Sequence, residues 1–364
     1  MKKAIAIASI SAVIFSMTPS AQAELTGGTW KITTDSVSLN LGGVSPHVEK
    51  TANGDRVWFA SPAALPDPIM VVDCNESGAC TRQTLASRFG SDATVVTLKD
   101  GTRKVFFVEM GPNGKKIRFA TIIGNTLSHG AVSELGVEGS SVSAKEMAWG
   151  VPDAVVLPDG RVRVYWVLAD PSLSNSRLPE TIVSATSTDA SATSFVRDPG
   201  TRLTGGYVDT EVLKAEDGDW VMIASTGPGA GTQSLYMATS TDGLNWNLVK
   251  TPISSQDESA LDPSGYQLSE NTWRIYYVSA EPGMRVDRNY QLKRATLSWK
   301  KEEAKPVASA SPSPVASASA EPSVAATPAP VAKSKKLTIT CLKGKTVKKV
   351  TGLNPKCPSG FKKK

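Results

Sequence analysis

The sequence is poor in three features, and each shortage narrows what the chain can be. Beyond the N-terminal residues, no stretch is apolar for long enough to cross a bilayer, so we expect no membrane span there. No long segment repeats its apolar residues with the helical period, which argues against a helical fold. Histidine occurs only at His47 and His129, and neither lies close in sequence to a cysteine. A metal site built on the cysteines is therefore not expected.

Residues 1–23 have the pattern of a secretory signal peptide. Two lysines precede an apolar run over residues 4–15, and small residues at positions 21 and 23 form a cleavage site before Glu24. An uncleaved membrane anchor is the alternative, but the run is short for spanning a bilayer. We therefore expect a secreted protein, either released or held at the cell surface.

The four cysteines form two local pairs. Cys74 and Cys80 bracket a short loop, whereas Cys341 and Cys357 bracket a lysine-rich stretch. In an exported chain each pair is expected to form a structural disulfide. The first would fix a hairpin loop, and the second would hold together a module too small for a core of its own.

Positive charge is concentrated at the C-terminus. The chain has a net charge of +6, but residues 333–364 carry eleven lysines and no acid, and the signal peptide carries two more. Subtracting these thirteen charges leaves −7 for residues 24–332. The calculated pI near 9.0 thus belongs to the tail, and nucleic acid is not an expected partner.

A hairpin unit recurs five times between residues 24 and 303. Each copy is an apolar strand, a tight Asn- or Asp-containing turn and a strand rich in aromatic residues. The turns end at Gly54, Gly101, Gly160, Gly218 and Asn271, so they lie 47, 59, 58 and 53 residues apart. An Ala-Thr pair at residues 120–121, 185–186, 238–239 and 295–296 predicts a third strand in four of the units.

The repeat predicts an all-β protein, a five-bladed β-propeller over residues 24–303. About 55 residues per unit suffice for four strands, and such units bury both faces only when they are arranged radially. We expect residues 28–40, with Trp30, to supply the outer strand of the last blade and so close the ring. An open β-sandwich is the alternative. The protein is expected to be a monomer.

Two further segments follow the propeller. Residues 304–336 form a low-complexity linker of Pro, Ala and Ser, which cannot bury a core and should be disordered. Residues 337–364 read Thr-Cys-x-Lys-Gly-Lys and then Pro-Lys-Cys-Pro-x-Gly-Phe. This pattern resembles short, Cys-paired, Lys-rich C-terminal modules on exported actinobacterial proteins. The module would either hold the protein on an anionic cell-wall polymer by charge or simply aid solubility.

The chemistry is expected where the five inner strands converge on the central channel. The first and third positions of each copy lie on one face of a regular strand. The first positions are Ser45, Asp92, Val151, Asp209 and Asp262, and the third are His47, Thr94, Asp153, Glu211 and Ser264. Carboxylates grouped in this way repel one another and raise a pKa, as a general acid in glycoside hydrolysis requires. Alternatively, these acids cap strands or bond to backbone amides between blades.

The repeated pattern Asp-x-x-Val-x-Leu-x-Asp-Gly-x-x-x-x-Tyr resembles the five-bladed propeller glycosidases of the arabinanase, xylosidase and fructosidase kind, including glycoside hydrolase families 43 and 32. The resemblance implies an oligo- or polysaccharide substrate and an Asp, Asp, Glu set that acts as base, pKa modulator and acid. In this sequence that order occurs as Asp92, Asp153 and Glu211. The first copy departs from the family, because Ser45 and His47 stand where the family places its base.

Two other functions stay open. One is a non-catalytic propeller that binds glycans or proteins at the cell surface. The other is a sialidase-like hydrolase, because Ser240-Thr-Asp-Gly-Leu-Asn-Trp246 resembles an Asp-box that is one residue short. The Asp-box is a structural turn, and a sialidase would also need an arginine triad and a sixth blade, neither of which recurs in the sequence.

Other residues are candidates for binding the substrate. Trp149 precedes the inner strand of the third copy and could stack on a sugar ring, and Glu146 lies on the same connection. His47, Asp209 and Asp262 would face the ligand in the channel. We expect no cofactor; a structural Ca²⁺ held by Glu146 or by the acidic pair at residues 257–258 is the alternative.

Overall fold

The computed structural model describes two units, residues 1–304 and 305–364, and each is considered by itself. The described residues are 25, 28–61, 69–84, 90–112, 114–123, 128–143, 149–169, 171–173, 176–282, 289–302, 337–343, 346–352 and 361–363. The predicted signal peptide, the predicted linker and Glu146 lie outside them. So do Cys357 and the side chains of Cys341 and His129.

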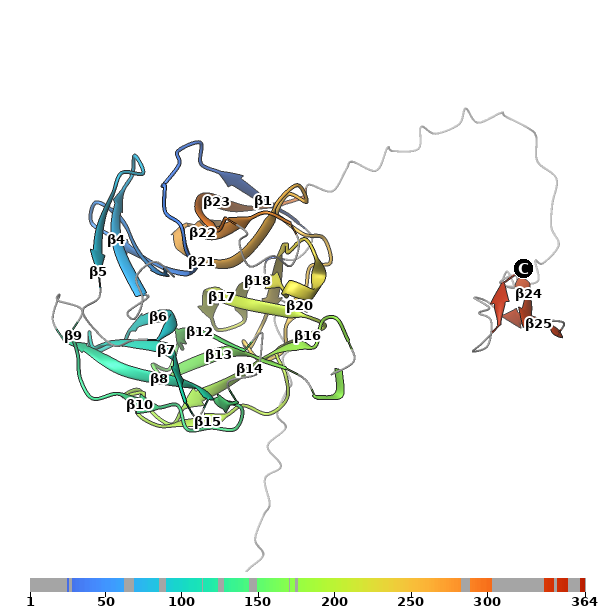
Figure 1. The fold of residues 1–364 in the computed structure, drawn as a ribbon, viewed down its shortest axis with the longest axis horizontal. Coiled ribbons are helices and arrows are strands. Elements are labelled where there is room, and N and C mark those ends of the chain that lie inside the picture. Colours follow the sequence, from blue (N-terminus) through green and yellow to red (C-terminus); the bar gives the residue numbers. More distant parts are fainter. Residues whose placement is uncertain are drawn as a thin grey trace, which may run out of the picture. The chain divides into compact units, whose positions relative to one another are not determined.

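The first unit is a five-bladed β-propeller, as predicted (Figure 1). Blade 1 consists of β2 (Val44–Thr51), β3 (Gly54–Ala60), β4 (Ile69–Asn75) and β5 (Cys80–Thr84). Blade 2 consists of β6 (Ser91–Thr97), β7 (Arg103–Gly111) and β8 (Gly114–Ile123), with β9 (Ser128–His129), β10 (Ser133–Glu134) and β11 (Ser141–Val142) paired to β8.

The remaining blades repeat this plan. Blade 3 consists of β12 (Gly150–Val156), β13 (Val162–Ala169) and β14 (Glu180–Ser187), with β15 (Phe195–Arg197) and β16 (Leu203–Thr204) paired to β14. Blade 4 consists of β17 (Tyr207–Glu216), β18 (Asp219–Thr226), β19 (Leu235–Ser240) and β20 (Asn247–Leu248). Blade 5 consists of β21 (Ser259–Ser269), β22 (Thr272–Ala280), β23 (Gln291–Lys301) and β1 (Gly28–Thr34).

The inner strands β2, β6, β12, β17 and β21 contact one another in a ring around the centre. Figure 1 shows four of them, β6, β12, β17 and β21, nearest that centre. The described helical segments are the short 3-10 turns η2 (Pro171–Leu173) and η3 (Pro228–Ala230), and none of the described residues forms a helix long and apolar enough to span a bilayer.

The turn that follows each inner strand explains the repeated sequence signal. The last residue of the five turns (Gly54, Gly101, Gly160, Gly218 and Asn271) has φ of 141°, 86°, 92°, 81° and 57°, respectively. Only glycine adopts such angles freely, and asparagine tolerates them better than other residues. The strand after each turn then supplies aromatic side chains to the core between blades, and Trp58, Trp166 and Trp273 are buried there.

The ring is closed by the N-terminal strand, which confirms the prediction. β1 pairs antiparallel with β23, from Gly28 opposite Lys301 to Thr34 opposite Ala295. Trp30 packs against Trp273 of β22, at 5.5 Å between ring centroids. Because the first strand of the unit completes its last sheet, the two ends of the propeller hold each other in place.

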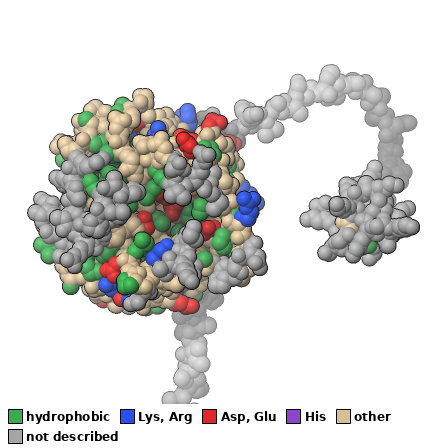
Figure 2. Space-filling view, in the orientation of Figure 1, with side chains coloured by type: hydrophobic (Ala, Val, Ile, Leu, Met, Phe, Trp, Pro, Cys, Tyr) green, Lys and Arg blue, Asp and Glu red, His purple; other side chains and the backbone are tan. Residues whose placement is uncertain are grey.

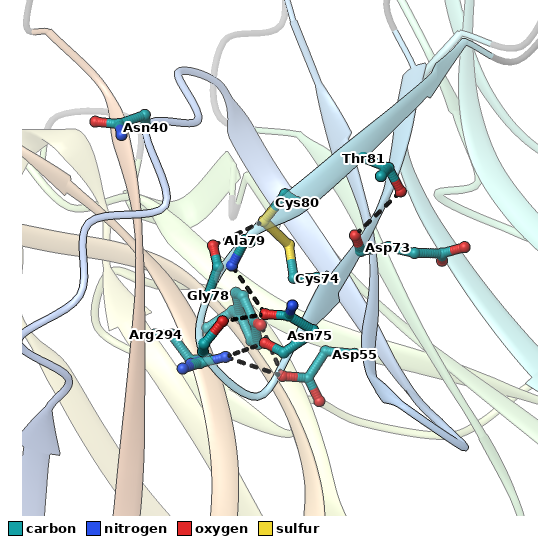
Figure 3. The surroundings of a disulfide bond; sticks show 12 residues. Asn40, Asp55, Asp73, Cys74, Asn75, Gly78, Ala79, Cys80, Thr81 and Arg294 are labelled. Carbon is teal, nitrogen blue, oxygen red and sulfur yellow. Dashed lines mark hydrogen bonds and ion pairs between the residues drawn. A yellow bond between two sulfur atoms is a disulfide. The ribbon is translucent and has the colours of Figure 1, made fainter.

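A disulfide lies beside this closure (Figure 3). Cys74 of β4 and Cys80 of β5 face each other across the two strands and are bonded, as predicted. The turn between them exposes the carbonyls of Asn75 and Glu76, which accept hydrogen bonds from the Arg294 guanidinium of β23 at 3.0 and 2.9 Å. The disulfide thus fixes a turn of blade 1 that contacts blade 5.

In the second unit, β24 (Leu337–Lys343) pairs with β25 (Thr346–Gly352) on one side and with β26 (Lys362–Lys363) on the other. The pairing of Cys341 with Cys357 lies outside the described residues and stays a prediction.

Candidate active site in the central channel

All five inner strands contain the same irregularity at the channel. The first-position residues Ser45, Asp92, Val151, Asp209 and Asp262 have φ of 50°, 55°, 46°, 48° and 48°, respectively. At each of these points the pairing with the next strand shifts by one residue, which is a β-bulge. Non-glycine residues rarely adopt positive φ, and the strain recurs at functional sites. A simple two-residue alternation therefore does not describe these strands.

The bulges direct residues of all five copies into one channel. Each of the five copies contributes two or three residues to the lining of one cavity. They are Ser45, Pro46 and His47; Asp92, Ala93 and Thr94; Val151 and Pro152; Asp209, Thr210 and Glu211; and Asp262 and Pro263. Among these are Asp92, Asp209, Glu211 and Asp262, whereas Lys and Arg are absent from the described lining. Figure 2 shows acidic side chains near the middle of this face. Four of the five carboxylates predicted to converge thus line one cavity, and Asp153 is not among its lining residues.

The first positions form one layer of hydrogen bonds that crosses four blades. Ser45 Oγ donates to Asp92 Oδ1 at 2.6 Å, and Ser45 N donates to Asp262 Oδ2 at 2.8 Å. The Asp262 carboxyl is in turn hydrogen-bonded to Asp209. Val151, the first position of the third copy, adds no polar group to this layer.

Asp209 and Asp262 are neighbouring buried carboxyl groups, and their surroundings favour the protonated form of Asp209. Burial raises the pKa of Asp209 well above its usual range, and the neighbouring Asp262 raises it further, while the Ser225 hydroxyl, 2.9 Å from Oδ2, opposes the shift. Two carboxyl groups can bond to each other only if one of them is protonated. The raised pKa therefore favours a proton on this pair. Burial also raises the pKa of Asp92, against the effect of hydrogen bonds from Ser45 and Ser91.

The third positions form a second layer, which ties each blade to the next. Asp153 Oδ2 accepts a hydrogen bond from Val212 N at 2.8 Å, and Glu211 Oε1 accepts one from Gly265 N at 3.3 Å. Ser264 Oγ accepts one from Val48 N at 3.0 Å. Each bond joins the third position of one copy to the backbone of the fourth position of a following copy. Bonding to amides between blades was the alternative considered for Asp92, Asp209 and Asp262; Asp262 makes such a bond with Ser45 N, and in this layer Asp153 and Glu211 do the same.

Asp153 and Glu211 form the second pair of neighbouring buried carboxyl groups. Their carboxyl groups are hydrogen-bonded, and burial raises the pKa of Asp153 to about 6. Burial and the charge of Asp153 raise the pKa of Glu211 well above its usual range, although the amide of Gly265 and the hydroxyl of Ser264 lower it. Two of the three predicted catalytic residues are thus in contact, and Asp92 lies in the other layer.

His47 lies in the same layer as this pair but in blade 1. Its Nδ1 lies 3.3 Å from Thr94 Oγ1, and burial lowers its pKa to about 4, so the ring is neutral at neutral pH. Its Nε2 has no hydrogen-bond partner among the described residues. The described part of the chain contains no group of three or more His, Cys, Asp or Glu arranged to hold a metal ion.

A larger cavity, about 200 Å³ in volume, lies beside the channel. Asp209 lines both cavities, and the aromatic rings of Trp149 and Tyr290 line the larger one. Trp149 is 5% exposed, and its Nε1 donates to Gly139 O at 3.1 Å, which fixes the orientation of the ring. The predicted sugar platform therefore stands at the wall of a cavity next to a protonated carboxyl pair.

No family model and no curated protein matches the chain. Solved structures do match. A thermostable family-43 glycoside hydrolase superposes with a TM-score of 0.54 and 14% identity, over 72% of this chain and 91% of its own. An endo-arabinase from Bacteroides thetaiotaomicron gives a TM-score of 0.51 and 11% identity, over 72% and 96%. An alpha-L-arabinofuranosidase from Podospora anserina, solved with cellotriose, gives 0.54 and 9%, over 77% and 99%.

The propeller has the fold of these glycoside hydrolases. At such low identities the likeness concerns the fold alone, and at that level it confirms the predicted resemblance.

The Asp-box-like segment of the propeller is a structural turn, as expected. Asp242 Oδ1 accepts hydrogen bonds from Leu244 N and Asn245 N, both at 2.8 Å, and Trp246 Nε1 donates to Gly243 O. Burial alone would raise the pKa of Asp242, but the bonds from Asn245 and Leu244 lower it to about 2. The Asp242 carboxylate thus fixes the loop that joins β19 to β20 within blade 4.

The pairing of Asp209 with Asp262 was not foreseen from the sequence, where both were candidates for substrate binding only. The sequence shows that both residues stand at the first position of their copies of the repeat, the fourth and the fifth. Only the bulge, which turns both first positions into the channel, brings their carboxyl groups into contact.

Proposed function

We propose that the protein is a secreted glycoside hydrolase whose acid and base are carboxyl groups of the central channel. The observation that carries this proposal is the presence of two buried carboxyl pairs with raised pKa at the centre of a propeller with a glycosidase fold. A general acid must hold its proton near neutral pH, and burial beside a second carboxylate is how a protein achieves this.

The roles of the proposed residues follow from their surroundings. Glu211 donates its proton to the glycosidic oxygen while the bond to the sugar carbon breaks, and Asp153 modulates its pKa. Asp92 acts on the other side of the sugar, as the base that takes a proton from water or as the nucleophile. Asp209, paired with Asp262, is a second donor, and it is the one that reaches the larger cavity.

The larger cavity is the proposed place of one sugar ring, next to Asp209, and the bond to be broken would extend from it toward the channel that Glu211 and Asp92 line. A volume of about 200 Å³ suits one sugar ring, with Trp149 and Tyr290 offering aromatic walls and Asp209 a hydrogen-bonding carboxyl group. Glycosides of arabinofuranose and xylose are the first substrates to test, because arabinan- and xylan-degrading enzymes are among the solved structures of this fold.

Secretion and surface attachment complete the proposal. The signal peptide pattern of residues 1–23 and the disulfide between Cys74 and Cys80 both suit an oxidising, extracellular environment. The basic residues 337–364 would hold the enzyme near an anionic wall polymer, at the end of a linker that lets the propeller reach its substrate.

The deciding experiment measures hydrolysis of aryl arabinofuranoside, xyloside, fructoside and sialoside by residues 24–364, with Glu211→Gln and Asp209→Asn compared. Both substitutions keep the size of the side chain. Turnover of one sugar that falls about a thousandfold in one variant identifies a glycosidase and its acid. If neither substitution changes the rate of turnover, the proposed catalytic roles of Glu211 and Asp209 are wrong. Binding of sugars without turnover by the wild type would favour a glycan-binding propeller, in which the inner acids serve only to join blades.

A further inference from the structure

A polar cavity lies in the seam that closes the propeller, apart from the central channel. Its volume is about 340 Å³. It is lined by residues of the closing strand β1, of β21 and β22, and of the segment 253–258 that leads from blade 4 into blade 5. Because successive residues of a strand point to opposite faces, Ala260 of β21 lines this cavity while Leu261 lines the cavity beside the channel. The two cavities thus lie on opposite sides of the start of one strand.

The polar groups of this cavity, which we name the seam cavity, suit a ligand that donates hydrogen bonds. Glu258 Oε2 accepts a bond from Ser279 Oγ, and the described residues supply no donor to its other oxygen. Tyr277 OH and Thr34 Oγ1 lie 2.9 Å apart, and the Ser255 hydroxyl of the lining donates to Asp257 Oδ2 at 2.8 Å. Burial, followed by the nearby charge of Glu258, raises the pKa of Tyr277, although Thr34 opposes the shift. The phenol therefore stays a neutral donor and acceptor.

Charge narrows the class of ligand. Glu258 is the charged residue of the described lining, and no Lys or Arg of that lining balances it, so an anion is disfavoured. One carboxylate also falls short of the several oxygen ligands that Ca²⁺ requires. A neutral molecule with neighbouring hydroxyl groups meets the carboxylate best, because two hydroxyls can donate to one carboxylate.

The rest of the lining is apolar. Ile32 of β1, Ile253 and Ala260 present aliphatic surface. Ile253 and the adjacent Ser254 are held in place by backbone and hydroxyl bonds to Leu235, at 2.8 and 3.0 Å. A firm cavity with one aliphatic wall and one hydroxyl- and carboxylate-bearing wall matches the two kinds of surface on a sugar ring, its C–H face and its hydroxyl edge.

We propose that the seam cavity is a second carbohydrate site, which binds a neutral sugar ring by its neighbouring hydroxyls at Glu258 and by its C–H face at Ile32 and Ile253. The site does not depend on turnover in the channel, so it stands whether or not the proposed hydrolase activity does. A glycan of several sugars bound there would be held on the propeller while another part of it enters the channel.

The test is calorimetric titration of residues 24–364 with xylotriose, arabinotriose and cellotriose, in an Asp209→Asn/Glu211→Gln background that prevents hydrolysis. At least one trisaccharide should bind, and Glu258→Gln should weaken binding about ten- to a hundredfold, since a hydrogen bond to a charged group is lost. Glu270→Gln is the matched control, because it removes the same charge from an exposed residue of blade 5 that does not line the cavity. It should bind as the parent does.

Three results would overturn the proposal. The first is that none of the trisaccharides binds, and the second is that Glu258→Gln leaves their affinity unchanged. The third is that putrescine or Ca²⁺ binds while the sugars do not. Ser255→Tyr serves as a second variant if Glu258→Gln does not fold, because Ser255 is an exposed lining residue and the larger ring would obstruct entry. Full binding by Ser255→Tyr would count against the site. If the wild type hydrolyses none of the glycosides but a trisaccharide still binds, only the proposed hydrolase activity is contradicted.

Discussion

At the scale of single residues, the acids of the channel are paired, and their surroundings favour the protonated form. Asp209 is paired with Asp262, and Asp153 with Glu211. In each case burial is the main reason that the pKa rises, and the second carboxyl group adds to it. A folded state that binds protons which the unfolded chain releases must lose stability as pH increases. The same protons that make an acid catalyst thus make the fold sensitive to pH.

Glu211→Gln should remove part of this sensitivity. The folded pKa of Asp153 is about 6, above its usual value, so stability is greatest at low pH and declines as pH rises toward and through 6. In the variant an amide N–H can donate to Asp153 at every pH, while the amide oxygen still accepts from Gly265. We expect equal melting temperatures near pH 4 and a variant that is more stable at pH 8, by about 1–3 kcal/mol.

Melting followed by circular dichroism from pH 4 to 8 measures this difference. Glu270→Gln, at an exposed position of blade 5, is the control and should track the wild type at all pH values. A constant offset between Glu211→Gln and the wild type over the whole range would show that the pair carries no shared proton.

At the scale of strands and turns, the sequence was informative wherever the local backbone or core requires one residue type. The Asn- and Asp-Gly turns and the aromatic strands after them predicted the five hairpins, and the Trp30 segment predicted the closing strand. The bulge could not be predicted. It occurs at Val151 as well as at Asp92, although a β-branched residue is unfavourable at positive φ, so the ring of blades imposes it rather than local preference. The contact between Asp209 and Asp262 could not be predicted either, because it depends on the same bulge.

One buried guanidinium is among the groups that join the last blade to the first, beside the bonds from Tyr266 and Tyr276 to Asp55. Arg294 of β23 donates to Asp35, just beyond β1, at 2.6 Å, and to two carbonyls of the disulfide-bonded turn of blade 1. Lysine carries the same charge but cannot direct donors to three acceptors in a fixed plane. Arg294→Lys should therefore lower the free energy of unfolding by about 1–2 kcal/mol.

Urea unfolding measures this change, with Arg161→Lys as the control. Arg161 also contacts an aspartate, Asp159, but its side chain is 43% exposed, and exposed ion pairs contribute little. If both variants lose the same stability, the ring closure does not rest on Arg294.

At the scale of the whole molecule, charge divides the chain into an acidic body and a basic end. Residues 24–332 carry −7, and the eleven lysines lie within residues 333–364. Opposite charges on two units that a linker joins would act on different partners, because screening limits each field to roughly 10 Å at physiological salt. The acidic propeller would then keep its channel for neutral sugars while the tail acts separately.

The tail should therefore determine retention on an anionic polymer. Residues 24–364 should bind to a dextran sulfate matrix at low salt and elute as the salt concentration rises, whereas residues 24–303 should pass through. Replacing Lys362, Lys363 and Lys364 by Gln should lower the eluting salt concentration without abolishing binding, because eight lysines remain. Elution of both lengths of chain at the same salt concentration would instead place the binding surface on the propeller. Retention that persists at high salt would indicate a contact other than charge.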